Sequence, residues 1–173
     1  MQGNDMENPY YYIQDCPDRG LGVFSNKSFR ANDYIMSFTG KLTPFSEIMD
    51  FTHYLQFAPD MFLGPSGGAD DYVNHSCDPN CSLYFENNKL VLRAIRDIEA
   101  GEELSFDYGT VQFTEPTNFE CKCGSSKCRG NISNFYALPD EVKQNYLKKN
   151  MVPLLSLYTL EEIKAAASNS LVA

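Results

Sequence analysis

The sequence has no apolar run that approaches the roughly 20 residues needed to cross a bilayer. It has no internal repeat, and its first residues, Met1 to Asn8, are too polar and acidic for a secretory signal peptide. We therefore expect an intracellular protein of the cytoplasm or nucleus, which is not secreted and whose thiols stay reduced. With 173 residues, of which 43% are apolar, the chain is long enough for one globular domain with a hydrophobic core.

Basic residues are scarce, with 14 Lys and Arg against 23 Asp and Glu, and the net charge is −9. Surfaces that bind nucleic acid are usually basic, so we expect no direct nucleic-acid binding and no membrane partner. An acidic surface attracts a basic partner, such as a peptide rich in lysine and arginine. The same charge is equally consistent with a contribution to solubility alone.

A dinucleotide-binding fingerprint is also missing. Gly20-Leu21-Gly22 lacks the third glycine and the helix that follows it in that motif. The two glycines allow a close backbone approach or a positive φ, and their spacing alone favours a turn between strands.

Short β-prone runs make up most of the chain, and turn residues recur about every 8–12 residues, which is typical of a mainly β protein. The clearest case is a hairpin over 81–95 with its turn at Asn87-Asn88. The other expected strands are 10–13, 34–39, 53–57, 61–63 and 104–106.

Helix signals occur once early in the chain and twice near its end. Thr43-Pro44 resembles an N-cap followed by a proline in the first turn, and predicts an early short helix through Met49. From Leu138 the pattern becomes helical, with Pro139 at a helix start. Thr159-Leu160-Glu161-Glu162 is a capping box that predicts a final helix.

Residues 74–80 read Asn-His-Ser-Cys-Asp-Pro-Asn. We expect no regular strand or helix here, because Asp-Pro-Asn breaks both and favours a turn. A loop this dense in polar side chains usually has a function.

The cysteines predict a metal site. Cys121, Cys123 and Cys128 place three thiols within eight residues, a spacing suited to one tetrahedral zinc ion. Cys77 is the best candidate for the fourth ligand, while Cys16 is expected to be a buried thiol. The other possible fourth ligands are Cys81, His53 and His75. Reduced, unligated thiols or a redox pair remain the alternative to zinc.

Four motifs occur in one order, and together they make the chain resemble the SET-domain family of protein lysine methyltransferases from about Asp18 to Gly130. The motifs are Gly20-Leu21-Gly22-Val23, the run 74–80, the run Glu-Leu-Ser-Phe-Asp-Tyr-Gly at 103–109, and the three-cysteine group. The last of these resembles the post-SET zinc segment.

The resemblance implies a mainly β (α+β) fold, the SET-domain β-clip of small sheets. In its pseudoknot-like core the 103–109 segment passes beneath the 74–80 loop. A post-SET zinc segment and C-terminal helices follow. We expect a SET domain over 8–113, the post-SET segment over 114–131, and a helical tail over 132–173.

The implied activity is methyl transfer from S-adenosylmethionine to the ε-amine of a lysine in a protein, for which histone tails are a frequent substrate class in the family. The resemblance also implies one structural zinc ion held by Cys77, Cys121, Cys123 and Cys128. Two other readings remain, a non-catalytic SET-fold module that binds peptides and a small structural protein organised by zinc. The enzyme reading is favoured because Asn74, His75 and Tyr108 are all present.

The resemblance also assigns site residues, and Tyr108 is the expected catalytic residue. The expected contacts of the methyl donor are Gly20, Leu21, Gly22, Asn74, His75, Tyr108 and Phe119. The expected channel for the substrate lysine contains Tyr54, Phe106 and Tyr108. A phenylalanine at 106 leaves space and brings no hydroxyl to trap a water, so we expect di- or trimethylation.

The chain departs from the family pattern in two places. Asp71 stands three residues before Asn74, where the family often has a basic residue. No cysteine-rich region precedes Gly20 in this sequence, so we expect no pre-SET zinc cluster like that of some histone methyltransferases.

Overall fold

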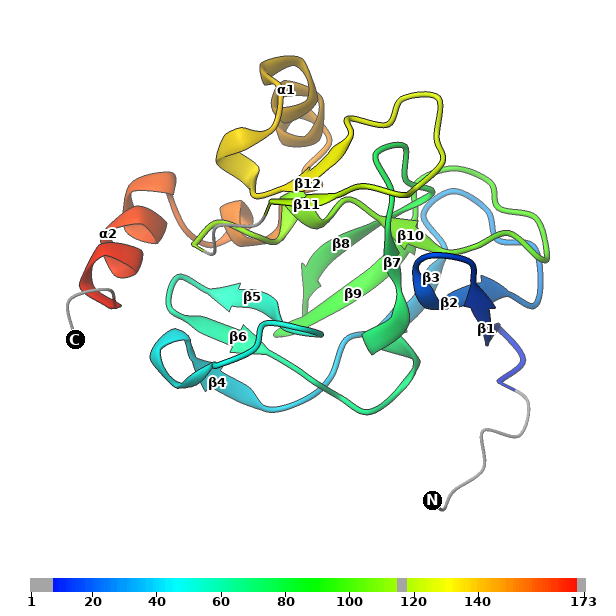
Figure 1. Cartoon of the computed structure of the whole chain (residues 1–173), viewed down its shortest axis with the longest axis horizontal. Helices are drawn as coiled ribbons and strands as arrows, with labels where there is room; N and C mark the ends of the chain where they lie inside the picture. Colours follow the sequence, from blue (N-terminus) through cyan, green and yellow to red (C-terminus); the bar gives the residue numbers. More distant parts are fainter. Residues whose placement is uncertain (1–7, 115–117, 171–173) are drawn as a thin grey trace.

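The computed structural model describes residues 8–114 and 118–170, so the acidic first residues lie outside the described part. Within these ranges the strands form five small sheets, and short helical turns and two α-helices connect or follow them (Figure 1). The expectation of a mainly β fold built from small sheets is confirmed. No helix in the described ranges is long and apolar enough to cross a membrane.

The first sheet is a hairpin of β1 (Tyr11–Cys16) and β2 (Gly20–Ser25), which pair antiparallel. The turn lies at residues 17–19, where Asp18 has a φ of 64°. The prediction of a turn at Gly20-Leu21-Gly22 is therefore wrong, because Pro17 and Asp18 already reverse the chain. Both expected uses of the glycines do occur, since Gly20 has a φ of 73° and Gly22 meets close neighbours.

The second sheet has the order β3 (Tyr34–Ser37), β9 (Lys89–Ala94) and β8 (Cys81–Glu86). The predicted hairpin over 81–95 is confirmed. Its turn residues Asn87 and Asn88 have φ values of 49° and 60°, the left-handed conformation that a tight hairpin turn favours.

The third sheet has the order β4 (Leu42–Pro44), β6 (Met61–Leu63) and β5 (Leu55–Ala58). The helix predicted from Thr43-Pro44 is wrong. Thr43 pairs with Phe62 inside this sheet and Pro44 is extended, so only a single 3-10 turn, η1 (Phe45–Glu47), follows.

The central loop begins as a strand. β7 (Asn74–His75) pairs parallel with β10 (Ser105–Phe106), so the expectation of no strand within 74–80 is wrong for its first two residues. The rest of the loop is hydrogen-bonded to the segment around β10 at its first residue, Ser76, and at its last, Asn80. The Ser76 N–H donates to the Phe106 carbonyl at 3.0 Å, and the Asn80 amide bonds the Glu103 carbonyl and the Ser105 N–H at 2.8 and 2.9 Å.

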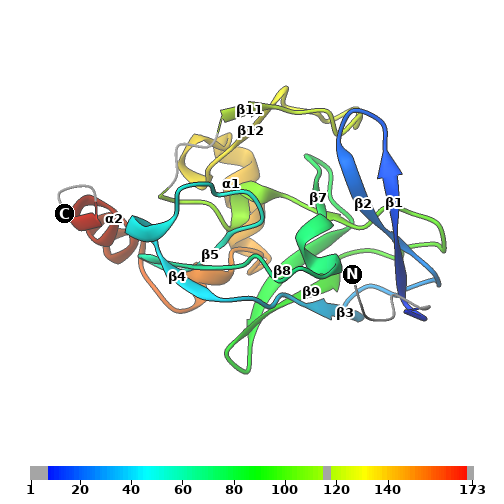
Figure 2. The same cartoon turned by 60° about the horizontal axis from the view of Figure 1, so that its bottom comes forward.

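Beyond β10 the chain forms β11 (Asn118–Glu120) and β12 (Asn131–Ser133), then α1 (Asp140–Lys148) and α2 (Leu160–Ser170). The predicted capping box is confirmed, because the Thr159 N–H donates to Glu162 Oε2 and the Glu162 N–H donates to Thr159 Oγ1. Short 3-10 turns complete the chain, namely η2 (Ala69–Tyr72), η3 (Tyr108–Thr110), η4 (Phe135–Ala137) and η5 (Pro153–Ser156). Figures 1 and 2 both place α1 next to β11 and β12.

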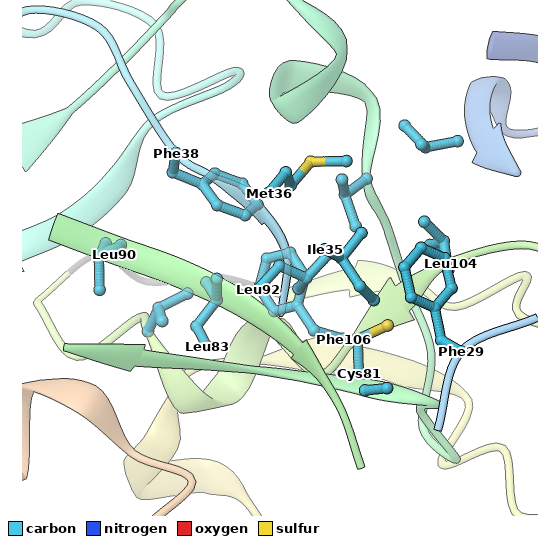
Figure 3. Close-up of a cluster of buried hydrophobic side chains, with 14 of the residues drawn as sticks. Phe29, Ile35, Met36, Phe38, Cys81, Leu83, Leu90, Leu92, Leu104 and Phe106 are labelled. Atoms are coloured by element: carbon cyan, nitrogen blue, oxygen red, sulfur yellow. The ribbon is translucent and has the colours of Figure 1, made fainter. Parts of the chain in front are cut away.

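Two apolar clusters form the core. The first joins the β3–β9–β8 sheet to β10 and includes Leu83, Leu92, Leu104 and Phe106, none more than 1% exposed (Figure 3). The second packs Phe113 against the C-terminal segment; its other buried members are Phe135, Leu138, Tyr146, Met151, Val152, Leu154 and Ile163. Tyr108 packs against the first cluster, and Phe113 of the second cluster follows five residues later, so both cores constrain the segment that carries Tyr108. The domain boundaries expected after residues 113 and 131 stay predictions.

Candidate active site

Two cavities flank Tyr108. The larger has a volume of about 520 Å³ and the smaller about 250 Å³. Four residues border both of them: Arg19, Asn74, Tyr108 and Ile132. The two cavities therefore meet beside Tyr108, between the β1–β2 hairpin, the central loop and β12.

The larger cavity contains all three expected channel residues, Tyr54, Phe106 and Tyr108. Of the expected donor contacts, Gly20, Leu21, Asn74 and Phe119 also border it. Three carboxylates, those of Asp50, Asp70 and Asp71, belong to its wall and give it a negative charge.

Asp71, the acidic residue at the position where a basic one is frequent, has a local structural explanation. Its carboxylate accepts hydrogen bonds from the Ser66 and Gly67 N–H groups, at 2.9 and 2.7 Å. The carboxylate therefore holds the glycine-rich connection that precedes η2 against the cavity wall.

The smaller cavity is bordered by His75 and by Cys121 and Cys123. We call residues 121–130, which carry three of the four predicted zinc ligands, the cysteine segment. Gly22 borders neither cavity. A Cβ at Gly22 would lie 2.6 Å from Cys16 Sγ and 2.9 Å from Asn74 Nδ2, so glycine is needed for the hairpin to approach the central loop. A direct contact of Gly22 with the donor stays a prediction.

Tyr108 opens η3 and is fixed by three neighbours. Its hydroxyl donates to the Val73 carbonyl at 2.9 Å, its N–H donates to His75 Nδ1 at 3.1 Å, and its ring centroid lies 5.0 Å from that of Phe106. Burial raises the pKa of Tyr108 above its ordinary value, and the charge of Glu103 acts in the same direction. The hydroxyl is therefore neutral at physiological pH, and its oxygen lone pairs remain free to interact with a bound group.

His75 connects Tyr108 to the cysteines. Because Nδ1 accepts the Tyr108 N–H, we assign the ring proton to Nε2, which lies 3.3 Å from Cys77 Sγ. Burial lowers the pKa of His75 to about 4, although Asp107 opposes the shift, so the imidazole is neutral. Both ring nitrogens are used inside the protein, which leaves the backbone and the ring surface for donor contacts.

Arg19 borders both cavities and is paired with Glu103, and the sequence analysis gave neither residue a role. The guanidinium of Arg19 binds both Glu103 oxygens, at 3.0 and 2.8 Å. Asn74 Nδ2 donates to Glu103 Oε1 at 2.9 Å and to the Leu21 carbonyl at 3.0 Å. These contacts tie the hairpin to the central loop. The available signal was a pair of opposite charges, one beside the glycine motif and one opening the 103–109 run.

Gln112 is a second residue that sequence reasoning missed. It is 7% exposed and borders the larger cavity, and its Oε1 has no hydrogen-bond partner among the described residues. Its Nε2 lies 3.5 Å from the Tyr54 carbonyl. The wall of the larger cavity thus includes a buried amide oxygen without a hydrogen-bond partner among the described residues.

The structure brings the four predicted zinc ligands together. The Sγ atoms of Cys77, Cys121, Cys123 and Cys128 all lie within 4.8 Å of one another, and those of Cys77 and Cys121 are 3.7 Å apart. Sulfurs bound at about 2.3 Å around a tetrahedral zinc ion would be roughly 3.8 Å apart. The donor set therefore fits a closed structural zinc site.

The other candidate ligands do not join this group within the described ranges. Cys81 is fully buried, and burial raises its pKa to about 12. Cys16 is 3% exposed, which confirms the expectation of a buried thiol. His75 contacts Cys77 from outside the four-sulfur group.

Known proteins with similar sequences are histone-lysine methyltransferases by name. Histone-lysine N-methyltransferase ash1 of Drosophila melanogaster is 32% identical over 131 residues, which cover 66% of this chain and 6% of ash1. The matched region spans 4% to 37% of the length of the curated relatives compared.

Solved structures share the fold. The methyltransferase domain of human Histone-lysine N-methyltransferase SETMAR superposes with a TM-score of 0.61 at 21% identity, covering 72% of this chain and 58% of that one. KRYPTONITE, in a complex with mCHH DNA, an H3(1-15) peptide and SAH, gives a TM-score of 0.60 at 19% identity and covers 70% of this chain and 29% of that one.

The family comparison covers most of the residues that border the larger cavity. The SET domain model matches residues 20–109, from the glycine motif to the turn that carries Tyr108. These are 90 of the 173 residues, or more than half of the sequence. The resemblance of the first three motifs is thus confirmed, whereas that of the cysteine group to a post-SET segment stays a prediction, and the chain belongs to the SET-domain family.

Proposed function

We propose that this chain is a protein-lysine N-methyltransferase, which transfers a methyl group from S-adenosylmethionine to the ε-amine of a lysine in a protein substrate. The observation that carries the proposal is the meeting of two cavities at Tyr108. Methyl transfer is an in-line displacement, in which the amine attacks the methyl carbon from the side opposite the sulfonium sulfur. A wall residue shared by two connected cavities is well placed to align them.

The donor would lie across the junction of the two cavities, because its expected contacts are divided between them. Gly20, Leu21 and Phe119 border the larger cavity and His75 the smaller, while Asn74 and Tyr108 border both. When bound, S-adenosylmethionine supplies an electrophilic methyl group on a positively charged sulfur. Asn74 and the Gly20–Leu21 backbone would hold it from the hairpin side, and His75 from the side of the cysteine segment. The Tyr108 hydroxyl would orient the attacking amine and stabilise the developing charge.

The lysine would enter the part of the larger cavity that Tyr54 and Phe106 border. A free lysine has a pKa of about 10.4 and is mostly protonated at neutral pH. An apolar channel and a nearby sulfonium both disfavour the ammonium form, so the site would lower that pKa. No nucleophile of the protein is needed, and alignment of the two reactants is its main contribution.

The acidic wall favours a basic substrate segment. Asp50, Asp70 and Asp71 border the larger cavity, and the whole chain carries a charge of −9. A histone tail has this chemistry, and the names of the relatives and the H3 peptide bound to KRYPTONITE support it as the substrate class. The reaction would take place inside the cell, in the nucleus or cytoplasm.

Direct binding of nucleic acid is not part of the proposal and remains an expected absence. The KRYPTONITE complex contains DNA as well as the peptide, so a DNA-binding measurement on this chain is the appropriate check. The second candidate function is a SET-fold module that binds peptides without catalysis.

Incubation with radiolabelled S-adenosylmethionine tests the function. We expect label to enter core histones, and a parallel incubation with lysate from the source organism covers other proteins. Label on lysate proteins only would keep the enzyme and reject the histone substrate. No label in either, with donor binding intact by calorimetry, would favour the peptide-binding module.

The same reaction tests the number of methyl groups added. Phe106 is 1% exposed and its ring packs on Phe38 and Tyr108, so a hydroxyl at this position would sit inside the expected channel. We expect di- or trimethyl-lysine as the final product in a mass spectrum, and a shift to monomethyl-lysine in Phe106→Tyr. Only monomethyl product from the wild-type protein after long incubation would contradict this expectation.

A further inference from the structure

The carboxylate beside Tyr108 binds three separate parts of the chain. Asp107 has a side chain that is 1% exposed, and it belongs to neither cavity wall. Its Oδ1 accepts the Gly109 N–H at 3.0 Å and Arg129 Nη2 at 2.9 Å, and its Oδ2 accepts the Tyr146 hydroxyl at 2.8 Å. We call Asp107, Arg129 and Tyr146 the Asp107 cluster.

Arg129 brings the cysteine segment into the Asp107 cluster. It follows the expected zinc ligand Cys128 directly, and its own N–H donates to Cys77 Sγ at 3.4 Å. Its guanidinium lies 2.8 Å from Asp107 Oδ2 and 3.5 Å from the Cys77 carbonyl. The order of the four-cysteine site and the position of the Asp107 carboxylate are therefore linked by one side chain.

Tyr146 brings helix α1 into the same cluster. Its ring is 4% exposed in the second apolar cluster, and it borders neither cavity. The segment leading into α1 also touches the turn that Asp107 caps. A Cβ at Gly109 would lie 2.9 Å from Leu138 Cδ2 and 3.0 Å from the Ser133 carbonyl, so the contact is already close.

A buried carboxylate needs all of its partners, because a charge left without compensation in the interior is strongly unfavourable. Removing one donor should therefore move the carboxylate and the turn it caps, rather than leave both in place. Since Tyr108 is the first residue of that turn, η3, the displacement reaches its hydroxyl.

We propose that helix α1 and the cysteine segment hold Tyr108 in its working position through the Asp107 cluster, which makes Tyr146 a positioning residue for methyl transfer. Helix α1 then stabilises the position of Tyr108 without bordering either cavity. The kinetic part of this inference rests on the proposed function, whereas the structural part does not.

Tyr146→Phe is the test, because it removes the hydroxyl and keeps the ring. The matched control is Tyr136→Phe, since Tyr136 belongs to the same apolar cluster and its buried hydroxyl has no partner among the described residues. We expect kcat to fall about 10-fold or more in Tyr146→Phe, with little change in KM, because a misplaced group slows the chemical step. Tyr136→Phe should keep wild-type kcat.

Two readouts do not depend on activity. Hydrogen–deuterium exchange should become faster in Tyr146→Phe over residues 106–111, which include the Gly109 amide bonded to Asp107. Zinc-loaded Tyr146→Phe should also release zinc faster to a chelator than Tyr136→Phe does, because Asp107 loses the Tyr146 hydroxyl, and a displaced Asp107 carboxylate holds Arg129 less firmly beside the cysteines. Both are measured at a temperature at which circular dichroism shows the variants fully folded.

The inference is overturned if Tyr146→Phe and Tyr136→Phe exchange alike over 106–111, whatever their activity. It is also overturned if kcat falls without faster exchange there, since the effect would then not pass through the turn. Faster exchange and zinc release in a protein whose wild type transfers no methyl group would support the cluster and reject the proposed function. If Tyr146→Phe does not fold, Arg129→Lys decides by the same readouts, because it keeps the charge and loses the planar fork.

Discussion

Replacing Tyr108 with phenylalanine is expected to lower kcat for methyl transfer by about 10²–10³-fold, the usual effect of removing one group that stabilises developing charge. The hydroxyl lies where the two cavities meet, and its hydrogen is committed to the Val73 carbonyl at 2.9 Å. Its oxygen can therefore act only as an acceptor or dipole toward bound reactants. Phenylalanine keeps the ring contacts with Phe106 and His75 and removes that oxygen.

Folding should be little affected by the same substitution. The Val73 carbonyl loses one donor, which corresponds to a loss of about 1 kcal/mol in the free energy of unfolding. Donor affinity, measured by calorimetry with S-adenosylhomocysteine, should stay within a few-fold of wild type, because Asn74, His75 and the hairpin backbone remain. Tyr34→Phe, which removes a hydroxyl outside both cavities, is the control.

The assay can be run at alkaline pH without a change in the state of Tyr108. Burial holds its pKa above the ordinary value of about 10, so the hydroxyl stays neutral while more of the substrate lysine loses its proton. Near-normal turnover by Tyr108→Phe across this range would remove the residue from the mechanism.

Local sequence was sufficient for features whose partners are close along the chain. The Asn87-Asn88 hairpin and the Thr159–Glu162 capping box each involve only neighbouring residues, and both were predicted. The cysteine spacing at 121–128 likewise restricts three sulfurs to a small volume. Cys77 is far along the chain from them, and spacing alone left it as one candidate among several.

Features decided by tertiary pairing were predicted incorrectly. Thr43-Pro44 has the local chemistry of a helix start, but hydrogen bonding of β4 to β6 outweighs it. Asn74 and His75 precede a turn sequence, and they become strand residues only because β10 lies beside them.

The Asp107 cluster was not predictable for the same reason. Arg129 and Tyr146 lie 22 and 39 residues beyond Asp107, and no periodicity relates such positions. The burial of Asp107 and Tyr146, and the partial burial of Arg129, are visible only once both cores are assembled. The sequence motifs thus indicated what borders the cavities, and the structure identifies what holds that border in place.

Replacing Cys121 with serine is expected to reduce the zinc content from about one ion per chain to nearly none. Cys121 Sγ lies 3.7 Å from Cys77 Sγ, and the Cys121 N–H donates to the Gly130 carbonyl, so Cys121 joins the central loop to both ends of the cysteine segment. Serine offers a much weaker ligand than a thiolate, and three remaining sulfurs do not close a structural site. Atomic absorption on the purified protein measures the stoichiometry.

Cys16→Ser is the control, because it makes the same substitution at a buried thiol outside the four-sulfur group. It should keep one zinc ion per chain. Retention of full zinc by Cys121→Ser, or its loss from Cys16→Ser, would contradict the assigned site.

Loss of zinc should weaken donor binding as well as stability, because the cysteines border the smaller cavity. In isolated zinc-finger peptides the metal contributes on the order of 10 kcal/mol, which is folding free energy. Here the four ligands come from two segments, and the first apolar cluster contains none of the four cysteines, so the β3–β9–β8 sheet should survive metal removal. We therefore expect Cys121→Ser to keep its β-sheet circular dichroism, to lose at least about 10-fold in affinity for S-adenosylhomocysteine, and to unfold at a lower temperature. Cooperative loss of all β structure on chelation would instead mean that the zinc site stabilises the whole domain.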